Sequence, residues 1–308
     1  MATSTPLRVH EVLPERTRPG RSPASTSWAP RLLPVVRLLV TVVLLGVLVA
    51  RFGAAAFRPA LDVLAPWPIV AALVLGGAAI AAQSARWRVV VLGSGYPLGR
   101  RRALVECYRS SALNSVLPGG IAGDAWRAWR QRIDAPRGWV PSAVSVATER
   151  VAGLGVLLVT AAVVLLVEGH PVYAGCALVG AVAACLMIRR PMQRLTAADR
   201  ARVWGWSAVA LLALVALTVV VGRTLDVPGG IGVLVTLGVV QLAGMSVPLS
   251  IGGWGPREAA GALAASLVGV APSAGIAMAA GYGLLTMVAV LPGFVALLIP
   301  TAAASRTR

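Results

Sequence analysis

The sequence predicts an all-α, polytopic integral membrane protein with about six full transmembrane helices and two re-entrant broken hairpins in an inverted-repeat arrangement. Three observations predict it. Of the 308 residues, 57% are hydrophobic, and the mean hydropathy is +0.80, which is more apolar surface than a soluble fold can hide from water. The apolar residues form runs long enough to cross a bilayer. The basic residues, all of them arginine, fall mostly between those runs.

A helix needs roughly 20 apolar residues to cross the hydrocarbon core of a bilayer. Six runs meet this length: 32–51, 66–85, 140–167, 171–188, 204–221 and 275–299. Gln83, Arg86 and Trp87 are interpreted as the interface end of the second run.

The two ends of the chain are polar. Residues 1–30 are rich in Pro, Ser, Thr and Arg, which predicts a disordered cytoplasmic tail rather than a cleaved signal peptide. Residues 301–308 are expected to be a short cytoplasmic tail. The sequence thus predicts one transmembrane domain over 31–300, whose halves cover about 31–167 and 171–300.

The stretch 103–117 is apolar but contains Glu106, Arg109 and Asn114. If it crossed the membrane, the four arginines within 127–137 would lie outside, against the positive-inside rule. A hairpin that enters, breaks at 118–123 and returns to the same side avoids this conflict. The alternative is a chain of eight full spans.

The second ambiguous stretch, 229–247, leads into "LAGMSVPLSIGGWGPRE" at 242–258. Aligning Pro248 on Pro118 gives the same order in both halves: apolar helix, proline, a glycine pair, another glycine, then charge. This weak internal repeat is typical of transporters built from inverted repeats with interrupted helices. The second hairpin is then expected to enter from the opposite side, and 259–271 is left unplaced.

The first break, "PGGIAGDAWR", leaves backbone N–H groups without helical partners, which costs several kcal/mol each in hydrocarbon. Glycines and a helix N-terminus attract anions, and an arginine clamps phosphate through two hydrogen bonds. The break therefore predicts a seat for a lipid phosphate. The alternative is a tight turn in which Asp124 caps the next helix. The predicted seat consists of Pro118, Gly119, Gly120, Gly123, Asp124 and Arg127.

Glu149 and Arg150 lie inside an apolar span, about 13 Å from its start, where a charge costs on the order of 3 kcal/mol. Neighbouring residues on a helix point in different directions, so each is expected to pair with another segment. The alternative is that both reach the inner membrane surface. The candidate partners are Arg127 and Arg257 for Glu149, and Asp124 and Glu258 for Arg150.

The segment "GGWGPRE" at 252–258 is predicted to be a mirror site, with Gly252, Gly253 and Gly255 in the break. Proline suits the first turn of a new helix. Glu258 is favourable near the helix start, whereas Arg257 is not and must meet another charge. The alternative is an exposed loop with Trp254 at the membrane interface.

Other function classes find little support. The net charge of +17 is attributed to arginines facing anionic lipid, so nucleic acid is not an expected partner. The three cysteines and two histidines lack metal-ligand spacing, and no hydrolase or protease motif is present. We therefore predict no catalytic residue, metal or cofactor.

Three segments, "SSALNSVLPGGIAGDAWR", "ATERVAGLG" and "PLSIGGWGPRE", resemble the lysylphosphatidylglycerol synthase transmembrane region family. This is the flippase-type membrane domain of the multiple peptide resistance factor proteins, and the resemblance covers roughly 35–300. The single glycine before Asp124 departs from the family pattern. The matching positions are Asn114, Pro118, Gly123, Asp124, Arg127, Glu149, Arg150, Pro248, Gly252, Gly253, Gly255 and Glu258.

The resemblance implies a lipid translocase without the soluble aminoacyl-transfer domain of the full-length relatives. It is expected to move an anionic or modified phospholipid, or a polyprenyl-linked lipid, across the cytoplasmic membrane of a bacterium, with both termini cytoplasmic. The alternatives are a membrane-embedded transferase and a non-catalytic partner of a separate lipid synthase. Expected partners are membrane lipids bound by headgroup or phosphate, together with such a synthase or a second copy of the chain.

The residues suggest how such a protein would hold its cargo. Three arginines are expected to bind the headgroup in turn, and three carboxylates to balance them when the site is empty. The two broken hairpins are expected to bring these groups together near the middle of the membrane. The arginines are Arg127, Arg150 and Arg257, and the acids are Asp124, Glu149 and Glu258.

Overall fold

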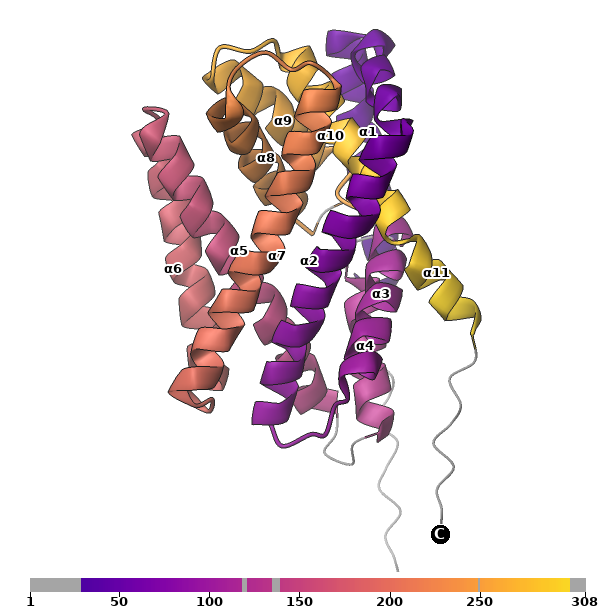
Figure 1. The fold of residues 1–308 in the computed structure, drawn as a ribbon, viewed down its shortest axis with the longest axis vertical. Coiled ribbons are helices and arrows are strands. Elements are labelled where there is room, and N and C mark those ends of the chain that lie inside the picture. Colours follow the sequence, from indigo (N-terminus) through magenta and orange to yellow (C-terminus); the bar gives the residue numbers. More distant parts are fainter. Residues whose placement is uncertain (1–28, 118–120, 135–138, 249, 300–308) are drawn as a thin grey trace, which may run out of the picture.

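The computed structural model describes residues 29–117, 121–134, 139–248 and 250–299, and over these ranges the chain is helical without strands (Figure 1). The predicted all-α class is confirmed. The predictions for the two tails fall on residues outside the described ranges, except for residues 29 and 30, which begin helix α1 rather than end a disordered tail. The helices are α1 (Ala29–Phe52), the 3-10 helix η1 (Ala54–Leu64), α2 (Pro66–Gly93), α3 (Arg100–Val116), α4 (Ala122–Asp134), α5 (Trp139–Val167), α6 (Pro171–Gln193), α7 (Ala197–Thr224), α8 (Ile231–Met245), α9 (Pro256–Leu267), α10 (Pro272–Ala289) and α11 (Leu291–Leu298).

Five helical segments of the described chain are long and apolar enough to cross a membrane, namely α2, α5, α6, α7 and the continuous α10–α11 pair. A sixth candidate is the end of α1 together with η1, which leaves it at 105°. Each of the six runs predicted from the sequence overlaps one of these segments, so the polytopic prediction is confirmed. On α6, Val172, Val179 and Met187 are largely exposed, as expected of a surface that faces lipid.

Helix α2 is longer than the sequence predicted. It has 28 residues and ends at Gly93 rather than near residue 85, so part of the predicted loop 86–102 is helical. The apolar residues that follow Arg88 extend the helix. The interpretation of Arg86 and Trp87 as an interface end is wrong, because both side chains are buried.

Two helical hairpins each begin and end at one end of the molecule (Figure 1). Helices α3 and α4 pack together with their outer ends at the lower end of the view, and α8 and α9 pack together with theirs at the upper end. The chain therefore turns back where an eight-span protein would continue. Helix α9 accounts for most of the stretch 259–271 that the sequence left unplaced.

The tips of the two hairpins touch. A Cβ atom at Gly252, in the turn between α8 and α9, would come within 2.5 Å of the carbonyl oxygen of Ser115 near the end of α3. Gly252 and Gly255 have φ angles of 56° and 93°, a region that side chains other than glycine rarely adopt. In the lower hairpin, a Cβ atom at Gly123 would overlap the backbone of Ser110. Glycine thus permits both the turns and the close contact.

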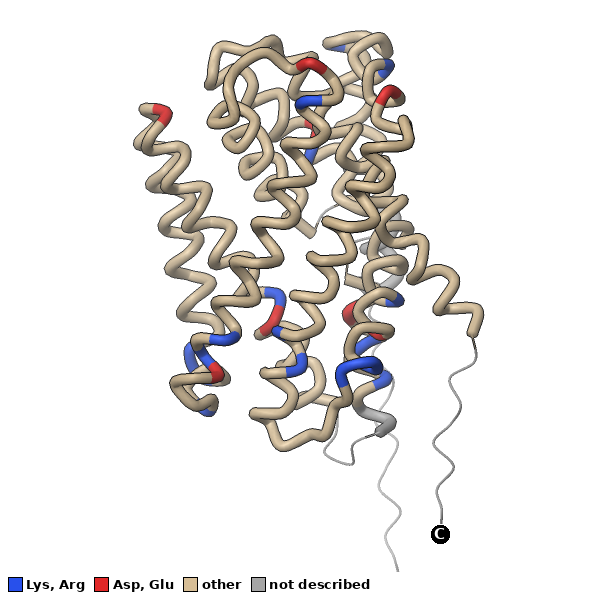
Figure 2. Tube along the Cα trace, in the orientation of Figure 1, with Lys and Arg blue, Asp and Glu red and all other residues tan. Residues whose placement is uncertain are grey.

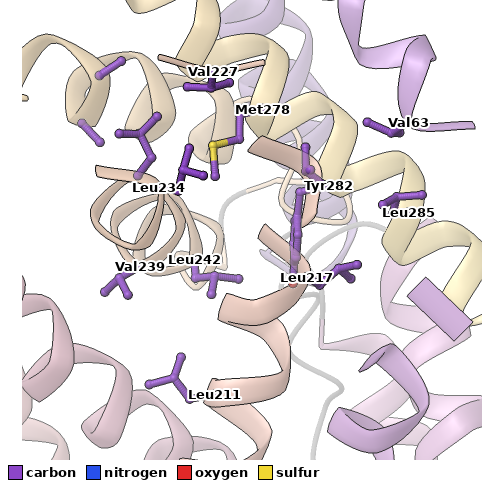
Figure 3. Packing of buried hydrophobic residues seen from close by; sticks show 14 of the residues in the cluster. Val63, Leu211, Leu217, Val227, Leu234, Val239, Leu242, Met278, Tyr282 and Leu285 are labelled. Atoms are coloured by element: carbon purple, nitrogen blue, oxygen red, sulfur yellow. The ribbon is translucent and has the colours of Figure 1, made fainter. Parts of the chain in front are cut away.

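Apolar packing holds the upper half of the molecule together (Figure 3). Leu217 of α7, Leu234 of α8 and Met278 of α10 belong to one buried cluster, and each is 0% exposed. Tyr282 and Leu285 of α10 join the same cluster. Smaller buried apolar clusters lie in the lower half, one around Trp87 and Val91 of α2 and one around Ala152 of α5. The charged side chains of the lower half are therefore set among apolar packing.

Most of the described arginines gather at the lower end of the molecule, which we call the basic end (Figure 2). It comprises the end of α2, the start of α3, the end of α4 and the connection between α6 and α7. The opposite end has few charges. An asymmetry of this kind is the usual sign of membrane orientation. Arginines of the basic end include Arg88, Arg100, Arg101, Arg102, Arg130, Arg189, Arg190, Arg194, Arg200 and Arg202.

Candidate functional site

Five charged side chains from three helices form one connected network in the lower half of the molecule. Arg86 comes from α2, Asp124 and Arg127 come from α4, and Glu149 and Arg150 come from α5. Four of the five residues are at least nine-tenths buried, and Arg150 is the exception. Buried charges of this kind survive only when they are paired and hydrogen-bonded.

Glu149 is the centre of the network and is 1% exposed. Its Oε1 accepts hydrogen bonds from Nε of Arg86 at 3.0 Å and from Nη2 of the same residue. Its Oε2 accepts from Nη2 of Arg127 at 2.8 Å. Arg127 was one of the two partners predicted for Glu149, whereas Arg86 was not predicted. One carboxylate therefore holds two buried guanidinium groups.

Arg127 makes several further contacts. Its Nη2 also contacts Oδ1 of Asp124 at 3.1 Å, and its Nη1 donates to Sγ of Cys107 at 3.1 Å. The guanidinium group lies over the ring of Trp87, 4.7 Å from the centroid, a favourable cation–π contact. Nε of Arg127 has no hydrogen-bond partner in this state, but both terminal nitrogens are bonded. The predicted phosphate clamp through two hydrogen bonds would therefore require some of these contacts to be exchanged.

Asp124 links Arg127 to Arg150. Its Oδ2 lies 2.8 Å from Nε of Arg150, and its Oδ1 accepts a hydrogen bond from Oγ of Ser110 at 3.2 Å. The structure thus pairs Arg150 with Asp124, one of its two predicted partners. The carboxylate of Asp124 bonds the side chains of Arg127, Arg150 and Ser110, rather than capping the start of the helix as in the alternative interpretation.

The network carries one surplus positive charge, since three guanidinium groups face two carboxylates. The side chain of Arg150 is 45% exposed, in contrast to 3% for Arg127 and 5% for Arg86. Arg150 lies 11 residues after the start of α5, about 16 Å along the helix. The structure thus shows a half-exposed cation more than a third of the way along an apolar helix that is long enough to cross a membrane.

Asn114 closes the lower hairpin. Its Oδ1 accepts a hydrogen bond from the backbone N–H of Gly123 at 2.7 Å, one of the groups that the start of a helix leaves without a partner. Asn114 therefore joins the end of α3 to the start of α4. Pro118, Gly119 and Gly120, which the sequence also assigned to the site, lie outside the described residues.

The upper hairpin holds a second arginine–glutamate pair. Nε and Nη2 of Arg257 donate to Oε1 of Glu258 at 3.0 and 2.6 Å, and the backbone N–H of Gly255 donates to Oε2 of Glu258 at 2.6 Å. Arg257 and Glu258 are 1% and 0% exposed. The guanidinium group lies 4.4 Å from the ring centroid of Trp254. The alternative of an exposed interfacial loop is therefore wrong.

Two expectations about the upper pair need correction. Arg257 was a candidate partner for Glu149, but it bonds its own neighbour, because its long side chain folds back over the first turn of α9. No ion pair between the described side chains joins the upper pair to the lower network. Asp124, Glu149 and Glu258 thus belong to two groups rather than one, and the hairpin tips touch through Gly252 and Ser115. Pro248 precedes this turn.

Residues 35–202 match the model of the lysylphosphatidylglycerol synthase TM region family, which is more than half of the chain. The chain belongs to this family. No curated protein matches it significantly. As a member of the lysylphosphatidylglycerol synthase TM region family, it is a multi-pass membrane protein of lipid metabolism or translocation. The match contains the entire lower network and ends before the upper hairpin.

Each arginine–glutamate group of this family member uses the same parts. In both, a guanidinium group bonds a buried glutamate, and an arginine lies over a tryptophan ring. In both, an arginine lies against a glycine of a neighbouring helix. A Cβ atom at Gly153 would come 2.6 Å from Nη1 of Arg86, and one at Gly283 would come 2.7 Å from Cζ of Arg257. The likeness supports the weak repeat in the sequence.

Arg86 was missed because its helix was predicted to end before it. Its signal was an arginine followed within α2 by the apolar run 89–92, which extends the helix beyond the charge. Arg86 also donates through Nη1 to Oγ of Ser207 in α7 at 3.0 Å. It thereby connects the network of α2, α4 and α5 to a fourth helix, α7.

Arg109 is a further buried arginine with a structural role. Its Nη1 bonds Oε1 of Glu106 at 2.9 Å, and its Nη2 donates to the carbonyl oxygens of Ala296 and Ile299 at 2.7 and 3.0 Å. These carbonyls lie at the end of α11, where a cation is favourable. As for metals, the described residues contain no group of three or more His, Cys, Asp or Glu side chains placed to hold one.

Replacing Gly153 with alanine is expected to destabilise the protein by about 1–3 kcal/mol. The new methyl group would overlap the guanidinium group of Arg86, which Glu149 and Ser207 hold in place. Gly155→Ala is the matched control, since its Cβ atom would have ordinary contacts of 3.7–3.9 Å. Thermal unfolding in detergent, followed by fluorescence-detected size-exclusion chromatography, measures both variants. Equal melting temperatures for the two would contradict the tight Gly153–Arg86 contact.

Proposed function

We propose that the protein is a flippase-like translocase for a membrane lipid with an anionic headgroup or phosphate. Its cargo is an anionic or modified phospholipid, or a polyprenyl-linked lipid, and its site of action is the cytoplasmic membrane of a bacterium. The basic end faces the cytoplasm in this proposal, in keeping with the positive-inside rule. Both termini are proposed to lie on the cytoplasmic side.

One observation carries the proposal: Arg150 is a half-exposed cation well inside an apolar helix, and it gives the network its one surplus positive charge. An exposed charge at this depth costs about 3 kcal/mol on insertion scales. A lipid phosphate beside Arg150 offsets this cost and neutralises the surplus. The acyl chains of such a lipid stay in the bilayer, along the apolar outer faces of the helices.

The contacts of Arg150 suggest how cargo is exchanged. In the empty state, Asp124 holds Arg150 at 2.8 Å. When a lipid phosphate replaces Asp124 as the partner of Arg150, Asp124 keeps its bonds to Arg127 and Ser110. The core of the network is therefore not disrupted. The arginine is the moving part, and the carboxylate stays fixed.

The Arg257–Glu258 pair is proposed to bind the headgroup in the second half of the transport cycle, after Arg150 has released it. Arg257 is buried while Arg150 is exposed, so the described state is accessible near the lower network and closed at the upper one. The hairpin tips meet at Gly252 and Ser115. A rocking movement of the two halves about this contact would bury Arg150 and expose Arg257, which is the alternating access of inverted-repeat transporters.

A leaflet-exchange assay tests the proposal. Purified protein is placed in vesicles that contain fluorescent NBD-phosphatidylglycerol, and dithionite is added outside to quench the outer leaflet. The wild-type protein is expected to expose inner-leaflet probe, whereas Arg150→Ala is expected to slow this at least tenfold. Arg190→Ala, an exposed arginine at the end of α6, is the matched control and keeps the wild-type rate.

Two results would overturn the proposal. One is a wild-type rate equal to that of protein-free vesicles. The other is equal rates for Arg150→Ala and Arg190→Ala. Mass spectrometry of the same vesicles addresses the alternatives: a newly formed lipid species without leaflet exchange would indicate the membrane-embedded transferase, and neither product nor exchange would leave the synthase-partner role.

A further inference from the structure

We propose that a small cavity at the basic end is a second anion site, which binds one phosphate-type oxyanion group. The cavity has a volume of ≈ 30 Å³ and lies where the end of α2, the start of α3 and the end of α4 meet. Trp87, Arg102, Glu106, Arg130 and Gln131 are among the residues that line it. Arg150 is not among them, so this site is separate from the exposed arginine of the lower network.

Two buried hydrogen-bond donors in the lining have no partner. Trp87 is 2% exposed and Gln131 is 8% exposed, and neither Nε1 of Trp87 nor Nε2 of Gln131 is hydrogen-bonded. The indole N–H can only donate. The amide oxygen of Gln131 already accepts from Oγ of Ser145 at 2.9 Å, which leaves its NH2 group. Since buried polar atoms are rarely left unpaired, both call for an acceptor in the cavity.

The charges of the lining indicate that this acceptor is an anion. Arg102 and Arg130 both line the cavity. The carboxylate there, Glu106, is bound by Nη1 of Arg109 at 2.9 Å and by Nε1 of Trp126 at 3.3 Å, and its Oε1 lies 3.9 Å from Nε of Arg130. The lining therefore has more positive than negative charge, and its unpaired atoms are donors. An oxyanion satisfies both conditions, whereas a cation satisfies neither.

The size of the cavity limits the ligand. A single water needs about 10–15 Å³ of such space, so ≈ 30 Å³ admits one compact group and excludes an acyl chain. Trp87 forms part of the wall, and its ring also carries the guanidinium group of Arg127 at 4.7 Å. Only the side chain of Trp87 thus separates an oxyanion in this cavity from Arg127 of the lower network.

The oxyanion has two sources, a free phosphate group from solution or the phosphate of a lipid in the adjacent leaflet. Two probes distinguish them. Inorganic phosphate is titrated into delipidated full-length protein in detergent, and the melting temperature is recorded, because a bound ligand stabilises the folded state. In parallel, native mass spectrometry counts the phosphatidylglycerol and phosphatidylcholine molecules that the protein retains.

Gln131→Leu removes the unpaired amide donor and keeps the size of the side chain. Arg102→Gln removes a charge from an exposed side chain, so it tests the site even if the first variant folds poorly. Gln193→Leu, at an exposed position at the end of α6, is the matched control. We expect both cavity variants to lose the response that the wild type and Gln193→Leu share.

Each outcome decides the proposal. A rise in melting temperature with phosphate that is lost in Gln131→Leu and Arg102→Gln supports the site with a free oxyanion. Retention of phosphatidylglycerol over phosphatidylcholine, lost in the same variants, supports it with a lipid phosphate. Binding of neither probe, or equal binding by all variants, overturns it, and the donors then face water. These readouts measure binding without lipid movement, so failure of the translocase proposal remains distinguishable.

Discussion

Replacing Glu149 with glutamine is expected to abolish lipid exchange and to destabilise the protein by about 3–5 kcal/mol or more. The substitution keeps the size of the side chain but removes the anion that Arg86 and Arg127 share. Both guanidinium groups are buried, so both would remain charged without a full partner. Removing one member of a buried ion pair is costly mainly because it strands the other.

The melting temperature in detergent and the leaflet-exchange rate measure this effect. Glu168→Gln is the matched control, because Glu168 lies in the turn between α5 and α6 and contacts only Oγ1 of Thr236, at 3.2 Å, among the interactions described. A second variant separates charge from shape: Glu149→Gln combined with Arg86→Gln should regain part of the lost stability, since it removes one stranded cation. A Glu149→Gln protein as stable and active as Glu168→Gln would refute the role of this carboxylate.

Replacing Glu258 with glutamine is expected to have an effect on stability of the same order, about 3–5 kcal/mol. Glu258 is 0% exposed and binds both Arg257 and the N–H of Gly255. The amide can still accept from Gly255, but it no longer neutralises Arg257. Because α9 begins at this point, the start of the helix is expected to loosen and the upper hairpin to lose its fixed tip.

Hydrogen–deuterium exchange followed by mass spectrometry locates this loss. Faster exchange in peptides that cover 250–262, with little change over α5 and α6, is the expected pattern. Leaflet exchange should fall as well, because the proposed cycle uses Arg257 after Arg150. Unchanged protection at the start of α9 would show that the Arg257–Glu258 pair contributes little to the hairpin.

Much of the fold could be predicted because hydrophobic length and arginine placement are local properties of a membrane protein. The run 140–167 became α5, and 171–188 became most of α6. The lower hairpin followed from the cost of placing arginines on the wrong side of the membrane. The upper hairpin followed from the repeated proline and glycine pattern.

The ion pairs were less predictable, because they depend on how helices pack against one another. Arg86 was placed at a surface, and only the contact between α2 and α5 shows that it meets Glu149. Arg257 was expected to meet a distant acid, but the turn at Gly255 lets it bond the next residue. The pairing of Asp124 with Arg150 was among the predicted alternatives, since few anions lie at that depth.

Leaflet exchange of NBD-phosphatidylglycerol by the purified wild-type protein, compared directly with Arg150→Ala at matched protein density, tests the central claim most directly. The account predicts rapid exchange by the wild type and a loss of at least tenfold in Arg150→Ala, while the melting temperature of the variant stays near that of the wild type because Arg150 is half-exposed. Equal exchange by the two proteins would contradict it, since an arginine that touches the passing headgroup has to matter.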